Sequence, residues 1–132
     1  MPLRHRTDPN AHRLALALGA ARTGLGVVAL FATEPTLKAL LFGETDGVGR
    51  ALARIAGARD LTLGLLTLAA HGDPARLRQL TLTASALDGA DAVAFAVASR
   101  EPQTRVAGLG GVVAGGGAAI AGAWAYRRLG GS

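Results

Sequence analysis

The feature that most constrains this chain is an uninterrupted apolar run near its C-terminus. Val106 to Tyr126 spans 21 residues and contains no Asp, Glu, Lys, Arg or His. A helix of about 20 apolar residues is long enough to cross the hydrocarbon core of a bilayer. A surface helix of a soluble bundle would show a charged face at every turn, and this run has none. The run therefore predicts a membrane-spanning helix and disfavours the alternative of a soluble, alanine-rich helical bundle.

Three further apolar runs precede it at regular spacing. Residues 14–32 contain one charge, Arg22, and residues 79–99 contain only Asp88 and Asp91. Residues 48–70 are the most polar of the set, with Arg59 and Asp60 in the middle of the run. We therefore predict an all-α fold, a bundle of four transmembrane helices in a single membrane domain over residues 1–132. The predicted spans are approximately 12–32, 48–71, 75–99 and 104–127.

Residues that favour helix starts mark the span boundaries. An Asp followed by a Pro places an N-cap carboxylate before a proline at the first helical position, as in Asp8-Pro9 and Asp73-Pro74. Asp46 can cap the second span, and Pro102 lies where the fourth should begin. The segment from Thr33 to Phe42 predicts a short interfacial helix between the first and second spans, ended by Gly43.

The net charge of +5 arises from 14 Lys and Arg against 9 Asp and Glu. Nucleic acid is disfavoured as a partner because the basic residues form no dense stripe with interleaved aromatic residues. The absence of Cys excludes disulfides and thiolate chemistry. The three histidines, His5, His12 and His71, lack metal-ligand spacing, so we expect no metal and no cofactor.

The distribution of basic residues predicts the orientation. With four spans, one side of the membrane holds seven of them and the other side holds five. Cytoplasmic segments carry the excess of Lys and Arg, so we expect a cytoplasmic-membrane protein with both termini in the cytoplasm. Trp124 and Tyr126 fit an aromatic anchor at that interface. The seven are Arg4, Arg6, Arg13, Arg76, Arg78, Arg127 and Arg128, and the five are Lys38, Arg50, Arg54, Arg100 and Arg105.

Charged residues inside the spans are the candidate functional site. A charge at bilayer depth costs at least about 2.5–3.5 kcal/mol, so such residues need partners or a function. Arg22, Asp60 and Asp88 each lie near the middle of a span, on a stripe of small residues that allows close helix approach. We expect these three to form one mid-membrane cluster. Arg59 lies one step around the helix and can pair with Asp91, pair with a neighbouring subunit, or extend toward the interface.

The charges of this cluster nearly cancel. Arg22 and Arg59 supply +2, and Asp60, Asp88 and Asp91 supply −3. We expect the carboxylate in excess to hold a proton in the low dielectric of the membrane, unless Arg54 reaches the cluster. Such a site is suited to moving a proton or to binding the polar end of a small lipophilic ligand. Ser85, close to Asp88 in the sequence, is a secondary candidate with Arg54, and whether the site catalyses a reaction is open.

Two alternatives remain beside this interpretation. In the first, the chain is a structural or accessory membrane subunit, and the buried charges only fix helix packing. In the second, it is a small proton-coupled transporter that acts as a homo-oligomer, specifically a dimer. The last span raises a smaller question of the same kind, because Gly115, Gly116 and Gly117 weaken a helix. We predict a packing face there, with a hinge as the alternative.

One segment carries a resemblance. Residues 49–64 have the pattern G-R-x-x-x-R-x-x-G-x-R-D-L-x-x-G, and Asp88 and Asp91 follow in the next span. With these residues the chain resembles an uncharacterised family of small bacterial and fungal four-helix membrane proteins, a domain-of-unknown-function family. The resemblance would cover nearly the whole chain. It implies the four-span fold and no established activity.

Overall fold

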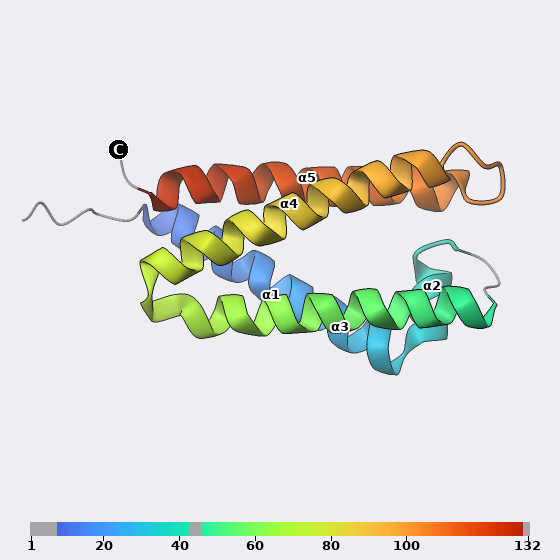
Figure 1. Ribbon diagram of the computed structural model, residues 1–132, viewed down its shortest axis with the longest axis horizontal. Coiled ribbons are helices and arrows are strands. Elements are labelled where there is room, and N and C mark those ends of the chain that lie inside the picture. Colours follow the sequence, from blue (N-terminus) through green and yellow to red (C-terminus); the bar gives the residue numbers. More distant parts are fainter. Residues whose placement is uncertain (1–7, 43–45, 131–132) are drawn as a thin grey trace, which may run out of the picture.

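The computed structural model describes residues 8–42 and 46–130, and within these ranges the chain is helical and contains no strand. The prediction of an all-α fold is confirmed. Each of the four long helices begins and ends within three residues of its predicted span (Figure 1). The elements in chain order are α1 (Pro9–Phe31), α2 (Thr33–Ala39), α3 (Gly47–Ala69), the single 3-10 turn η1 (Ala70–Gly72), α4 (Pro74–Ala98) and α5 (Arg105–Leu129).

Aspartate caps set the starts of α1, α3 and α4, as predicted. The carboxylates of Asp8, Asp46 and Asp73 accept hydrogen bonds from backbone N–H groups of the first turn at 2.9, 2.8 and 3.0 Å. The start of α5 differs from the prediction, because residues 101–104 form turns and the helix begins at Arg105 instead of Pro102. Thr104 is the N-cap of α5, without a side-chain capping bond.

The short helix predicted after the first span is α2. It ends at Ala39, and Leu41 then adopts a left-handed conformation with a φ of 64°. That conformation costs a non-glycine residue roughly 1–2 kcal/mol. It turns the chain away from the helix axis before Gly43, the predicted terminator, which lies outside the described residues.

The long helices form two antiparallel hairpins, α1 with α3 and α4 with α5, and glycines bring each pair into close contact. A Cβ atom added at Gly64 would lie 2.7 Å from the carbonyl oxygen of Gly19, and one at Gly57 would lie 3.1 Å from that of Gly26. In the second hairpin, added Cβ atoms at Gly122 and Gly115 would meet Ser85 and the Asp88–Ala92 turn. Close approach of this kind requires small residues at the contact.

Both hairpins pack in the same register. A step of seven residues separates Gly19 from Gly26 and Gly57 from Gly64, and the same step separates Gly115 from Gly122. Ser85 and Ala92, the partners of the last two, are again seven residues apart. The seven-residue step is the repeat of left-handed helix pairs. The chain therefore uses one packing scheme twice.

The two hairpins meet mainly at one end. There a small apolar core joins residues from α1, η1, α4 and α5, while α3 and α4 contact each other little. Figure 1 shows the ribbons converging where α1 begins and α5 ends, so both described chain ends lie at the same end of the bundle. The core residues are Ala11, Ala15, Ala70, Leu77 and Leu129.

The distribution of side chains is that of a membrane protein. The buried positions are mostly Ala, Gly, Ser and Thr, whereas large apolar side chains cover the outside, among them Phe31 (83% exposed) and Val113 (76% exposed). A soluble domain of this size would bury its large apolar side chains. Three helices, α1, α4 and α5, are long and apolar enough to cross a membrane.

The prediction of four apolar spans is wrong for α3. This helix has the length of a span, but it contains Arg50, Arg54, Arg59 and Asp60, and any 18 consecutive residues within it include at least three charged side chains. The sequence already marked residues 48–70 as the most polar run, and the prediction rested on its length and on the regular spacing of the set.

Candidate functional site

Arg22 of α1 stands at the centre of a buried polar cluster between the hairpins. Its Nη1 donates to Asp60 Oδ1 of α3 at 2.7 Å, and its Nη2 donates to Asp88 Oδ1 of α4 at 2.5 Å. The side chains of all three residues are only 11–13% exposed. Gly19 and Gly26 flank Arg22 on its helix face and allow α3 to approach, which brings Asp60 within reach. We call Arg22, Asp60 and Asp88 the inner triad.

A second ion pair continues the cluster toward the outside. Arg59 Nη2 donates to Asp91 Oδ2 at 2.6 Å, and its Nη1 donates to Asp91 Oδ1 at 3.1 Å, which is a two-point contact between α3 and α4. The same guanidinium reaches Asp60 Oδ1 at 3.3 Å. Arg59 and Asp91, here called the outer pair, are 32% and 34% exposed. The sequence left three possible partners or positions for Arg59, and in the structure it pairs with Asp91.

Together the five residues form one chain of alternating charges, the Arg/Asp network. It runs Asp88, Arg22, Asp60, Arg59, Asp91, so each guanidinium lies between two carboxylates and each end is a carboxylate. In the described part of the chain, no buried side-chain nitrogen or oxygen lacks a hydrogen-bond partner. Fully charged, the network carries −1, because its three carboxylates outnumber its two guanidiniums.

A small pocket touches the inner end of the network. It has a volume of about 20 Å³, which is room for about one water molecule. All four long helices contribute to its wall, and its polar lining consists of Arg22, Asp88, Thr67, Thr81 and Ser85. Pockets for small-molecule ligands typically enclose about 300–1,000 Å³. The pocket as it stands therefore has room for a water molecule and is much smaller than a site for a lipophilic ligand.

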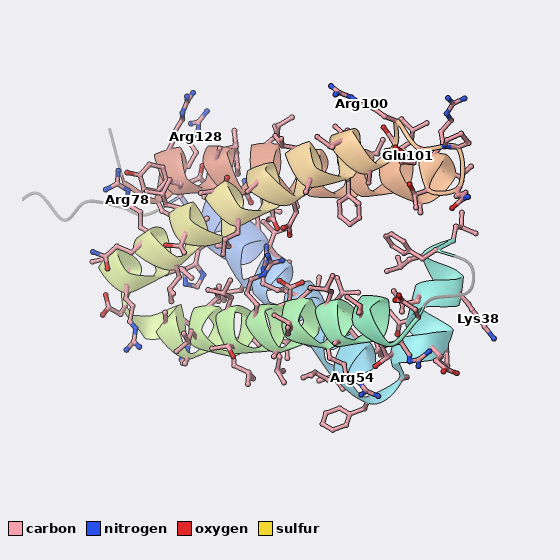
Figure 2. The ribbon with its side chains drawn as sticks, turned by 45° about the vertical axis from the view of Figure 1, so that its right-hand side comes forward. Lys38, Arg54, Arg78, Arg100, Glu101 and Arg128 are labelled. Carbon is pink, nitrogen blue, oxygen red and sulfur yellow. The ribbon has the colours of Figure 1, made fainter. Side chains whose placement is uncertain are left out.

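The secondary candidates do not join the network. Arg54 of α3 donates through Nε to Thr33 Oγ1 of α2 at 3.2 Å and is not part of the Arg/Asp network. Figure 2 labels its side chain. Ser85 Oγ donates to the carbonyl oxygen of Ala119 at 2.6 Å and so ties α4 to α5 beside the pocket. Within residues 8–42 and 46–130 no three His, Asp or Glu side chains are grouped to hold a metal ion.

Thr67 is a site residue that the sequence reasoning missed. It is buried, lines the pocket, and its hydroxyl donates to the carbonyl oxygen of Leu63. The signal was present, because Thr67 continues the helix stripe through Gly57, Asp60 and Gly64 at a spacing of three and four residues. Extending that stripe by one step would have found it.

The end of the bundle near the chain termini carries basic and aromatic side chains. The guanidinium of Arg78 lies 4.2 Å from the ring centroid of Tyr126, and that of Arg128 lies 5.7 Å from the ring of Trp124. Figure 2 shows Arg78 and Arg128 at this end and Lys38 toward the other. The predicted aromatic anchor therefore has cation–π contacts, whereas Arg4 and Arg6 lie outside the described residues.

Comparison with protein-family models, with curated proteins and with solved structures found no match for this chain. The likeness to a four-helix membrane family therefore stays a prediction from residues 49–64 and the two aspartates of α4.

Proposed function

We propose that this chain is a four-span membrane protein whose Arg/Asp network takes up a proton and passes it between two carboxylates. The observation that carries the proposal is the alternating order of the network, with a carboxylate at both ends and one negative charge in excess. Because a net charge at membrane depth is costly, one proton neutralises the network at the lowest free energy.

The position of α3 beside α1 supports a fourth span. The backbones of the two helices touch at Gly26 and Gly57 and again at Gly19 and Gly64, so α3 shares the depth of α1 along most of its length. Large apolar side chains of α3, Leu52, Ile55 and Leu65, face outward. Its two central charges, Arg59 and Asp60, are paired within the network. We infer that α3 crosses the membrane as a polar span covered by α1.

The two ends of the network differ in their surroundings, which gives the proton two distinct positions. Asp88 lies beside the one-water pocket in the centre of the bundle, and Asp91 lies at the partly exposed edge between α3 and α4. A proton on Asp88 leaves Asp91 ionised and paired with Arg59, and a proton on Asp91 leaves Asp88 ionised and paired with Arg22. The network as a whole is neutral in both states. The intervening Asp60 accepts from the guanidiniums of Arg22 and Arg59.

Infrared spectroscopy of the protein in phosphatidylcholine vesicles tests the proposal. We expect the carbonyl stretch of one protonated carboxyl group at neutral pH, absent from both Asp88→Asn and Asp91→Asn because each variant brings the network to zero charge. Glu101→Gln, at an exposed position between α4 and α5, is the matched control and should retain the band. A wild-type spectrum without a protonated carboxyl group at neutral pH would refute the proposal.

Proton movement across the membrane is a separate measurement. With a pH gradient across vesicles that enclose a pH-sensitive dye, we expect proton entry above that of empty vesicles, lost in Asp88→Asn and in Asp91→Asn. Entry equal to that of empty vesicles would mean that the network binds a proton but does not carry it across the membrane. Equal entry in wild type and both variants would place the path elsewhere.

The structural alternative has its own support, because the network supplies polar contacts between two hairpins that otherwise meet mainly at one end. Under that alternative, the variants change stability or partner association and the wild-type network holds no exchangeable proton. A lipophilic ligand, the family membership and a cytoplasmic membrane with both termini in the cytoplasm stay proposals from the sequence. The basic and aromatic end of the bundle supports the orientation.

A further inference from the structure

The outer pair lies at an edge of the bundle that its own chain leaves partly uncovered. Arg59 and Asp91 bridge α3 and α4 and remain about one third exposed, although both lie well inside helices of span length. The inner triad, by contrast, is almost completely buried. An exposed ion pair at that depth would face hydrocarbon, where its unused hydrogen-bonding capacity is costly. This edge, the α3–α4 seam, therefore calls for polar cover.

The opposite seam shows that the fold is able to close such an edge. The two hairpins face each other along two seams, α1–α5 and α3–α4. Along α1–α5 the helices are in contact, and small residues such as Ala15, Ala118 and Gly122 lie around the central pocket. Along α3–α4 the two helices touch less than α1 and α5 do, and the outer pair bridges them. The asymmetry places the uncovered polar groups on one side.

We propose that a second copy of this chain covers the α3–α4 seam, with Arg59 of each copy placed against the partner's Asp91. A two-fold axis brings the same patch of both subunits together, so a patch with one cation beside one anion is complementary to itself. The outer pairs of two copies then form a closed ring of alternating charges, which satisfies the donors and acceptors that one copy leaves exposed.

The residues around the outer pair permit this approach. Ala94 on α4 and Ala56 on α3 lie within one turn of Asp91 and Arg59, respectively, and both are exposed. Small side chains at these positions let helices of two copies come close enough for their charged groups to meet. The dimer rests on charge complementarity and on the membrane position proposed above for α3, and it does not depend on the proton.

Cysteine cross-linking in vesicles tests the dimer directly, because the chain has no cysteine of its own. We expect Ala94→Cys to form a disulfide-linked dimer at low protein density. The matched control is Val113→Cys, an exposed position on α5 away from the seam, which should link about tenfold less. Equal linking at both positions, or a chain that remains monomeric, would overturn the proposal and leave the seam to lipid.

A second comparison separates the interface from folding. Asp88 and Asp91 lie one turn apart on α4, and replacing either with Asn removes one negative charge from the same network. In the Ala94→Cys background, Asp91→Asn should lower dimer yield about tenfold, because it removes the anion that faces the partner's Arg59, and Asp88→Asn should leave the yield unchanged. An equal loss in both variants, or no loss in Asp91→Asn, would overturn the proposal whatever the infrared result.

Discussion

At the scale of single residues, position within the Arg/Asp network decides what each carboxylate contributes. Asp60 receives hydrogen bonds from both guanidiniums, whereas Asp88 contacts only Arg22 and Asp91 contacts only Arg59. An Asn at an end keeps an acceptor oxygen for its single arginine and brings the network to zero charge. An Asn at the centre leaves two cations with one weak acceptor between them.

We therefore predict that Asp60→Asn destabilises the protein much more than Asp88→Asn. Breaking a buried pair typically costs about 3–5 kcal/mol, and we expect a loss near the lower limit for Asp60→Asn. For Asp88→Asn we expect a change within about 1 kcal/mol, because Asp88 accepts from Arg22 alone and the Asn keeps an acceptor oxygen for it. Unfolding with sodium dodecyl sulfate in mixed micelles measures both free energies. Equal losses would mean that the network is not a chain with a centre and two ends.

Glycine at a helix contact is the other residue-scale determinant. A Cβ atom added at Gly26 would lie 2.7 Å from the carbonyl oxygen of Gly57, whereas one added at Gly24 would meet nothing within 4 Å. Gly26→Ala must push α1 away from α3, at a cost of about 1–3 kcal/mol. Gly24→Ala should instead be neutral or stabilise the helix by up to about 1 kcal/mol. The same unfolding titration checks the pair, and a neutral Gly26→Ala would contradict the close helix contact.

At the scale of helices, α3 shows why a hydropathy criterion and a structure differ. The criterion counts charges along the helix, and α3 exceeds it. The structure shows where those charges go: Arg59 and Asp60 bond within the network, and Arg54 bonds to Thr33 near the start of the helix. A polar helix can occupy membrane depth when its charges are paired with one another inside the bundle.

If α3 crosses the membrane, its two ends must lie on opposite sides. We predict that single cysteines at Val48, near its start, and at Gly72, just after its end, react with an impermeant thiol reagent from opposite faces of sealed vesicles. Both positions are exposed, and a Cβ atom at Gly72 would meet nothing within 4 Å. Labelling of both from the same face would place α3 on the membrane surface and remove the fourth span.

Much of the element-level description was predictable from the sequence. The Asp caps and the length of the apolar runs predicted the long helices, because these signals are local. The side chain that pairs with Arg59 was not predictable, since helical spacing allowed Asp91, a neighbouring subunit or the interface. The sequence alone could not tell which glycines of α5 pack against another helix. Gly115 packs against α4, whereas Gly116 and Gly117 meet nothing within 4 Å in a continuous helix, which favours packing over a hinge.

At the scale of the whole molecule, the chain consists of two hairpins that are tightly packed internally and loosely joined. Each hairpin is held by glycine contacts spaced seven residues apart, and the hairpins share an apolar core at the end that carries both described chain ends. Toward the other end they are joined by the Arg/Asp network and by the rings of Phe42 and Phe95, whose centroids are 6.0 Å apart. The network therefore sets how far the hairpins open.

We predict that Arg22→Met separates the hairpins without unfolding either one. The variant leaves Asp60 and Asp88 without their shared cation and gives the network an excess of two negative charges, so the two carboxylates repel each other across the interface. Distances between spin labels report the outcome. A pair at Leu40 and Gln103, one in each hairpin at the open end, should show a longer and broader distribution, whereas a pair at Phe31 and Val48, both in the first hairpin, should not change. Broadening of both distributions would mean that glycine contacts alone do not hold each hairpin together. No change in either would mean that the aromatic and apolar contacts, and not the network, set the distance between the hairpins.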